Sequence, residues 1–203
     1  MNWRVPVLVL GATAVLASGC AHPRSMRSQN SIPEACRATC ERLGIPPSRL
    51  VLVASISSQT LSLFEHGRLV KKYPCSTSRF GIGQIAGSNR TPLGLHQIAE
   101  KIGGGEPAGT VFKSRAIIGH TSQPEFAGAK ITTRILWLEG LEPGFNQGQN
   151  VDSHERYIYI HGTANQETIG QPASCGCLHL ADADLIPLFD LVPAGTLVWI
   201  SEK

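Results

Sequence analysis

Concentrated charge is absent from this 203-residue chain. Its 18 lysines and arginines exceed its 15 aspartates and glutamates by only three, and both signs are spread along the sequence. Because nucleic-acid-binding proteins usually carry clusters of basic residues, the sequence does not predict a nucleic-acid partner. The slight positive bias would suit a polymer that carries carboxylates.

Helical periodicity is also scarce. Between Leu50 and Ile160, short β-like runs alternate with turns of glycine, proline and asparagine, a pattern typical of strands. An apolar stripe with helical spacing occurs late, at Leu185, Leu188, Phe189 and Val192. Pro187 inside this stretch predicts that the helix begins late or bends. The sequence therefore predicts a mostly β fold with one late helix and a closing strand at 196–200.

The N-terminal apolar run, residues 5–16, is too short to be a membrane-spanning helix. Arg4 before it and the small residues 17–19 after it are typical of an export signal over residues 1–19. Cys20 follows directly, which predicts a lipoprotein with its lipid on Cys20; ordinary cleavage after the small residues is the alternative. Either route exports the mature protein to the periplasm or cell envelope, and the lipid would attach it to a membrane.

Residues 20–49 are predicted to form a tether and one short helix. The helix is expected over 33–43, with a capping box at Ser31–Glu34 and Gly44 as its stop. A single domain over 50–203 follows, since about 180 mature residues are enough for one hydrophobic core.

Two segments near the end of this domain carry the residue types of covalent catalysis. A strand that ends at His161 would place Tyr157 and Tyr159 on the same face as the imidazole. After a loop, the chain returns with Cys177 and His179 on one face. A thiol beside an imidazole can perform acyl transfer, because a paired imidazolium would hold the thiol pKa below its free value of about 8.5.

These residues resemble the catalytic domain of the L,D-transpeptidases of the YkuD type. The family signature of His-Gly followed by Ser-x-Gly-Cys and an aliphatic residue corresponds here to His161-Gly162 and Ser174-Cys175-Gly176-Cys177-Leu178. The resemblance extends over about residues 50 to 201 and includes the turn at 91–94 and a strand at 131–136. Ordered motifs are more specific than a lone one. The resemblance implies a β-sandwich-like catalytic domain.

The resemblance also implies a role for each residue of the signature. Cys177 would be the nucleophile and His161 the base that takes its proton. The backbone carbonyl of Gly162 would fix the imidazole tautomer. Backbone N–H groups near Gly176 and Cys177 would stabilise the oxyanion.

Two departures from the signature concern the neighbours of the nucleophile. His179 stands where relatives usually have Arg or Asn, and a substrate-binding or structural role is favoured for it over that of base. Cys175 stands where relatives often have His. Ser174 is a candidate for supporting the loop or contacting substrate, with an ordinary loop serine as the alternative. Tyr159 is a candidate for lining the cleft, although packing is the commoner fate of such a residue.

By resemblance, the reaction is acyl transfer on peptidoglycan stem peptides in cell-wall remodelling, without a cofactor. Cys177 would attack the carbonyl of the L-centre of a diamino acid and expel the terminal D-alanine. The acceptor would be the amine of a second stem or of an envelope protein; water would make the protein a carboxypeptidase. The rival from another class is a non-catalytic envelope- or zinc-binding module with Cys175, Cys177, His161 and His179 as ligands. Its C-x-C spacing is atypical, so no metal site is predicted.

The six cysteines suggest disulfide formation. With Cys20 and Cys177 assigned to lipid and catalysis, the remaining four are Cys36, Cys40, Cys75 and Cys175. An oxidising exterior predicts at least one disulfide among them, with the pairing left open.

Overall fold

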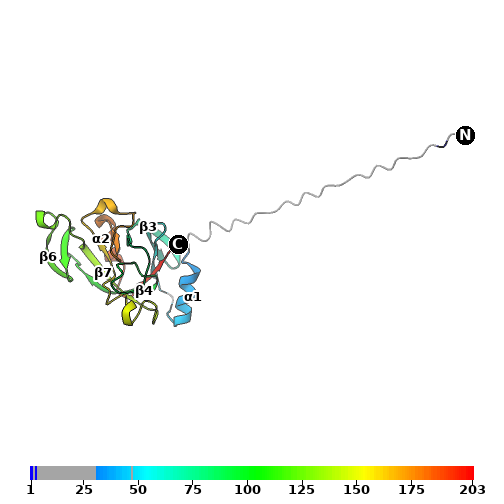
Figure 1. Ribbon diagram of the computed structural model, residues 1–203, viewed down its shortest axis with the longest axis horizontal. Helices are drawn as coiled ribbons and strands as arrows, with labels where there is room; N and C mark the ends of the chain where they lie inside the picture. The colour runs from blue at the N-terminus through cyan, green and yellow to red at the C-terminus, as the bar shows by residue number, and fades with distance from the viewer. Residues whose placement is uncertain (2, 4–30, 47) are drawn as a thin grey trace.

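A computed structural model describes residues 1, 3, 31–46 and 48–203 (Figure 1). The predicted lipidation site Cys20 and residues 21–30 lie outside the described residues, as does the predicted export signal apart from Met1 and Trp3.

The strands join into one mixed ten-stranded sheet. Its order is β3-β2-β1-β10-β4-β7-β5-β6, with β8 paired to β7 and β9 paired to β8. The strands are β1 (Leu50–Ser55), β2 (Thr60–Glu65), β3 (Arg68–Pro74), β4 (Gly94–Ile102), β5 (Thr110–Lys113), β6 (Ala116–His120), β7 (Thr132–Gly140), β8 (Tyr159–Gly162), β9 (Leu178–Leu180) and β10 (Leu197–Ser201). The mostly β prediction is confirmed. The sheet branches at β7, which pairs with β4, β5 and β8.

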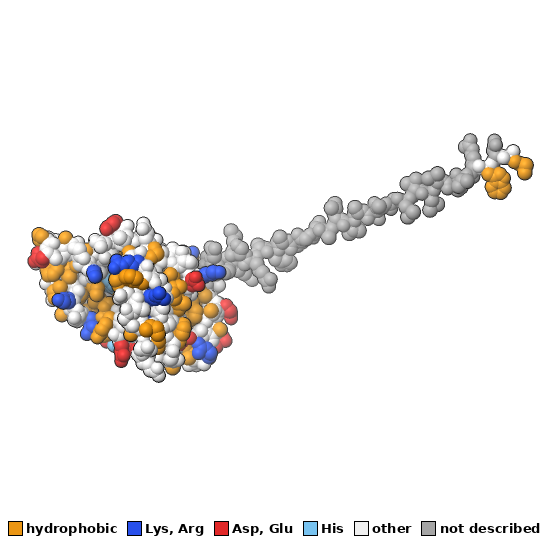
Figure 2. Space-filling model, in the orientation of Figure 1, with side chains coloured by type: hydrophobic (Ala, Val, Ile, Leu, Met, Phe, Trp, Pro, Cys, Tyr) orange, Lys and Arg blue, Asp and Glu red, His pale blue; other side chains and the backbone are white. Residues whose placement is uncertain are grey.

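Five helices connect or cover the strands among the described residues: α1 (Glu34–Leu43), α2 (Asp182–Leu191) and the 3-10 helices Pro124–Phe126, Gln149–Val151 and Gln166–Thr168. α1 and the hairpin of β5 and β6 lie at opposite ends of the domain (Figure 1). Within the described part of the chain, no helix is both long and apolar enough to cross a membrane. Figure 2 shows basic side chains at several separate places on the visible face, interspersed with acidic and apolar ones.

The central strand β1 is buried on both faces, which explains its continuous apolar sequence. Leu50, Leu52 and Ala54 enter the main core together with the stripe of α2. Val51 and Val53 alternate to the other face, where they belong to a smaller cluster with Cys36 of α1. The sheet therefore lies between α1 on one face and the main core on the other.

Substitution of Leu52 would measure how much the main core contributes to the free energy of unfolding. The side chain of Leu52 is fully buried, so Leu52→Ala should lower the free energy of unfolding by about 2–5 kcal/mol. Val70 is exposed, and Val70→Ala should change the free energy of unfolding by less than about 0.5 kcal/mol. Urea denaturation would measure both, and equal effects would contradict this description of the core.

The predicted helices are present, with two corrections. α1 ends at Gly44, which has a left-handed φ of 66°, as a glycine stop predicts. It begins after Pro33, whose side chain has no hydrogen-bonding group, so the predicted capping box is wrong. α2 begins at Asp182 and continues through Pro187, so it does not begin late.

The strand before His161 is shorter than predicted. β8 begins at Tyr159, because Tyr157 lies in a turn with a left-handed φ of 57°. Strand alternation therefore fixes the direction of Tyr159 but not that of Tyr157.

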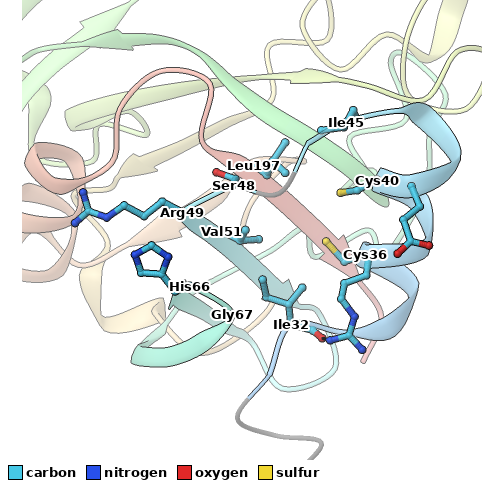
Figure 3. A pocket seen from close by; sticks show the side chains of 12 residues that line it. Ile32, Cys36, Cys40, Ile45, Ser48, Arg49, Val51, His66, Gly67 and Leu197 are labelled. Carbon is cyan, nitrogen blue, oxygen red and sulfur yellow. Dashed lines mark hydrogen bonds between the residues drawn. The ribbon is translucent and has the colours of Figure 1, made fainter.

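The prediction of a disulfide is wrong for the four cysteines considered, since every cysteine among residues 31–46 and 48–203 is a free thiol. Cys36 and Cys40 are one turn apart on α1, where Cβ atoms are about 5–6 Å apart, while a disulfide needs about 3.5–4.5 Å. Both thiols project from α1 toward the sheet (Figure 3), into an apolar cavity of about 660 Å³. Neither Cys177 nor His161 lines this cavity.

Candidate active site

Parallel pairing of β8 and β9 brings the two segments of the predicted site together. His161 is in register with His179, and their ring centroids are 4.7 Å apart. Leu178 and Leu180, on the opposite face of β9, are fully buried in the main core. The apolar side chains thus anchor β9 and leave His179 beside His161, with Cys177 immediately before the strand.

A cavity of about 430 Å³ opens at this point. It is lined by Cys177, His161, His179, Ser174 and Cys175 of the predicted site, and by eight further residues: Arg79, Lys130, Ile131, Thr163, Asn165, Thr168, Pro172 and Ala173. The cations Arg79 and Lys130 were not found by sequence reasoning. They come from segments that are distant along the chain, and no motif marks them.

The imidazole of His161 is buried and has a fixed orientation. Its Nδ1 lies 2.7 Å from the carbonyl oxygen of Gly162. A carbonyl can only accept a hydrogen bond, so Nδ1 carries the proton and Nε2 is the free basic nitrogen. His179 differs, because its Nδ1 is buried without a hydrogen-bond partner among the described residues.

Cys177 is held by the backbone of the neighbouring segment. Its thiol donates to the carbonyl oxygen of Tyr157 at 3.3 Å, and the sulfur accepts from the N–H of Tyr159 at 3.4 Å. No hydrogen bond between Cys177 and His161 occurs in the described structure. The thiol must therefore turn away from Tyr157 before it can transfer its proton to an imidazole.

Burial keeps both members of the pair neutral. It raises the pKa of Cys177 to about 12. Burial, and then the neighbouring His179, lower the pKa of His161 to about 3, and burial lowers the pKa of His179 to about 4. The expected thiolate–imidazolium pair is therefore not the resting state, since desolvation penalises each charged form.

Ser174 organises the cysteine loop from within. Its hydroxyl accepts from the N–H of Gly176 at 3.2 Å and donates to the carbonyl of Cys177 at 2.6 Å. Both hydrogen bonds are internal to the loop. The N–H of Gly176, a predicted oxyanion donor, is thus occupied in this state.

Gly176 is required by the backbone and by its surroundings. Its φ is 121°, a conformation that residues with a Cβ rarely adopt. An added Cβ would also lie 3.3 Å from the carbonyl oxygen of Arg90. This close approach explains why glycine directly precedes Cys177.

Tyr159 packs rather than lining the cavity. Its ring is buried and meets Trp137 edge to face, with ring centroids 5.6 Å apart. Cys177 packs against the same apolar cluster. The structure therefore supports the alternative considered for Tyr159, which is packing in the core, over a role in lining the cavity.

Cys175 is exposed. No group of three or more His, Cys, Asp or Glu side chains suited to hold a metal ion occurs in the part of the chain that the structure describes.

Comparison with known proteins identifies a family by sequence and finds solved structures of similar fold. A family model for the L,D-transpeptidase catalytic domain, YkuD, matches residues 49–200. The YkuD protein of Bacillus licheniformis is 27% identical over 150 residues, which cover 74% of this chain and 64% of that protein. Among solved structures, Bd1075 of Bdellovibrio bacteriovorus has a TM-score of 0.50 at 16% identity, over 77% of this chain and 49% of that one.

An L,D-transpeptidase from Mycobacterium smegmatis has a TM-score of 0.49 at 22% identity, over 75% of this chain and 58% of that one. The chain thus spans less than two thirds of the length of each of these three proteins. The family model covers most of the chain, in the region that holds both β8 and β9. The chain therefore belongs to the L,D-transpeptidase catalytic domain family.

Proposed function

We propose that this protein is a cysteine-dependent L,D-transpeptidase that acts on peptidoglycan stem peptides in cell-wall remodelling. The observation that carries the proposal is the hydrogen bond from His161 Nδ1 to the Gly162 carbonyl at 2.7 Å. It leaves a basic nitrogen in the cavity that also contains the Cys177 thiol. Family membership supports the same assignment.

Acylation would proceed by general-base catalysis. His161 Nε2 takes the proton of Cys177 as the sulfur attacks the carbonyl carbon at the L-centre of the diamino acid. The intermediate collapses, the C–N bond to the terminal D-alanine breaks, and the leaving amine takes the proton from His161. A thioester on Cys177 remains.

In the transfer step, the acceptor amine is the nucleophile and the sulfur of Cys177 is the leaving group. An acceptor amine attacks the thioester and gives a proton to His161. The sulfur leaves, and His161 returns the proton to it. Because both groups begin neutral, no charged pair is needed before substrate arrives.

The oxyanion of each tetrahedral intermediate would be met by backbone N–H groups near Gly176 and Cys177. The N–H of Gly176 first has to leave Ser174 Oγ, its acceptor in the resting state. His179, Arg79 and Lys130 line the same cavity and would contact the carboxylates of the stem.

Product analysis tests the function. The purified protein should be incubated with disaccharide-tetrapeptide, alone and with an amine acceptor, and the products identified by mass spectrometry. The proposal expects release of D-alanine and a cross-linked or amine-capped product. Hydrolysed tripeptide alone would make the protein an L,D-carboxypeptidase, and unchanged substrate with folded protein would contradict both assignments.

We further propose that the protein is exported and attached to a membrane through lipid on Cys20, so that it works in the periplasm or cell envelope. Three features of the sequence support this: Arg4, the apolar run after it, and the small residues before Cys20. Each CH₂ group buried in lipid contributes about 0.8 kcal/mol, so acyl chains on Cys20 would hold the protein at the membrane.

The full-length protein should accordingly partition into detergent, and Cys20→Ala should become soluble or remain uncleaved. Phase separation and the intact mass of the mature protein would measure this. An unmodified Cys20 in the mature protein would contradict lipidation and leave export alone.

A further inference from the structure

Arg156 is a half-buried cation with one unused donor. Its Nη2 donates to the carbonyl oxygen of Arg90 at 2.7 Å. Its Nη1 is buried and has no hydrogen-bond partner among the described residues. Buried donors are nearly always paired in folded proteins, so an unpaired guanidinium nitrogen calls for an explanation.

The backbone contacts of Arg156 place its charge at the cysteine loop. The Arg90 carbonyl that it binds is the same one that approaches Gly176, at 3.3 Å from the position of an added Cβ. The next residue after Arg156 is Tyr157, whose carbonyl accepts the hydrogen bond of the Cys177 thiol. Both contacts place Arg156 close to the turn at Gly176 and Cys177.

The guanidinium reaches this turn from a different side than the proposed base does. Arg156 and Cys175 line a separate polar cavity of about 380 Å³, which is not lined by His161 or His179. The cysteine loop therefore has the two neutral imidazoles, together with Arg79 and Lys130, in one cavity and the guanidinium of Arg156 in the other.

We propose that Arg156 is a charge-stabilising residue of the active site, whose guanidinium favours the negative charge that develops on Cys177 as its proton leaves for His161. The inference rests on the proposed role of Cys177 as nucleophile. Arg156 makes no hydrogen bond to the sulfur, so it acts through space. Its effect is on the charged state of the thiol rather than on the geometry of the base.

The electrostatic environment of Cys177 agrees with this assignment. Burial and Cys175 raise the pKa of the Cys177 thiol, whereas the hydrogen bond from the backbone N–H of Tyr159 and, after it, the charge of Arg156 act in the opposite direction. Tyr159 also faces the sulfur, and burial raises its pKa, so its phenol is neutral at pH 7. Arg115 lies beyond Tyr159, 3.4 Å from its hydroxyl.

Arg156 forms no ion pair with the groups around it among the described residues. His96 is buried and its pKa is lowered to about 4, so it is neutral at pH 7. Asp152 and Glu155 line the same cavity. The carboxylate of Asp152 already accepts three backbone N–H bonds, from Gly148, His154 and Glu155.

The positive charge of Arg156 would favour proton transfer from Cys177 to His161, which the burial of both groups opposes. Burial raises the pKa of the Cys177 thiol and lowers the pKa of the His161 imidazole, so moving a proton from the thiol to the imidazole is unfavourable. A fixed cation interacts with the thiolate but hardly with the thiol, so it lowers the free energy of the charged state selectively.

Alkylation with a neutral and an anionic reagent tests the proposal. In a Cys175→Ala background, the rate constants of Cys177 with iodoacetamide and iodoacetate would be measured against pH. Arg156→Gln should lower the ratio of the iodoacetate rate to the iodoacetamide rate by about three- to tenfold and move the pH profile upward. Arg156→Lys should largely restore both. Arg49→Gln, which removes an exposed arginine paired with Glu65 away from the site, is the matched control and should leave both unchanged.

An unchanged reagent ratio and pH profile in folded Arg156→Gln would overturn the proposal. If that variant does not fold, a protein with Arg156 intact but with Arg79 and Lys130 both replaced by Gln supplies the second readout, because these two cations also line the cavity of Cys177. Its iodoacetate-to-iodoacetamide ratio at Cys177 should exceed that of a cysteine-containing peptide by a similar factor, and an equal ratio would also overturn it. Neither reagent requires stem peptide, so a failure of the transpeptidase assignment would be recognised separately by product analysis.

Discussion

Cys177→Ala should abolish acyl-enzyme formation with stem peptide, while Cys175→Ala should retain it. The glycine that precedes Cys177 has the positive φ and the close backbone contact that set this turn, and the sulfur lines the cavity that also contains His161. Cys175 lines the same cavity but lies on the other side of Gly176 and is exposed. The two variants are therefore a matched pair: each removes one thiol from one loop.

Intact-mass spectrometry after incubation with disaccharide-tetrapeptide, followed by peptide mapping, would measure the result. A carbapenem is a second acylating probe and should label the same sulfur. An adduct on Cys175 in active protein would show that the nucleophile has been assigned to the wrong thiol.

His161→Ala should lower the rate of acylation by stem peptide by about 10²–10⁴-fold, the usual contribution of a general base. The hydrogen bond from Nδ1 to Gly162 leaves Nε2 ready to accept a proton. His179→Ala should instead weaken reaction with stem peptide while sparing reaction with a small neutral alkylating agent, because His179 has no partner on Nδ1 to fix its tautomer among the described residues.

The pH dependence provides a further check on the same residue. Burial lowers the pKa of His161 to about 3, so the imidazole remains an unprotonated base as pH falls through the ordinary histidine value of about 6.5. The acid limb of acylation should therefore lie below about pH 5. If His179→Ala abolished acylation while His161→Ala spared the reaction with the small alkylating agent, His179 would be the base.

The mostly β class of the fold, several of its elements and the two segments of the site could be predicted because each depends on local sequence. The continuous apolar run at Leu50–Ala54, the stripe of α2 and the glycine stop of α1 each fix an element through its own residues. The likeness of the segments around His161 and Cys177 to a known family then indicated that these two segments meet. The parallel pairing of β8 and β9 places His161 opposite His179.

What could not be predicted depends on tertiary contacts. The protonation states of Cys177 and His161 follow from burial by segments far away along the chain, so the sequence suggested an ion pair where the structure has two neutral groups. The left-handed turn at Tyr157 and the guanidinium of Arg156 carry no motif. Arg156 acquires its position only through the carbonyl of Arg90, which is distant in sequence.

In the proposed mechanism, Cys177 forms a thioester with the stem peptide. The most direct measurement is the intact mass of the purified protein, quenched in acid shortly after mixing with disaccharide-tetrapeptide. We predict a mass increase equal to the donor minus D-alanine, located on Cys177 and discharged when an amine acceptor is added. A folded protein whose Cys177 can be alkylated but which gains no such mass, or gains it on another residue, would contradict the proposed mechanism.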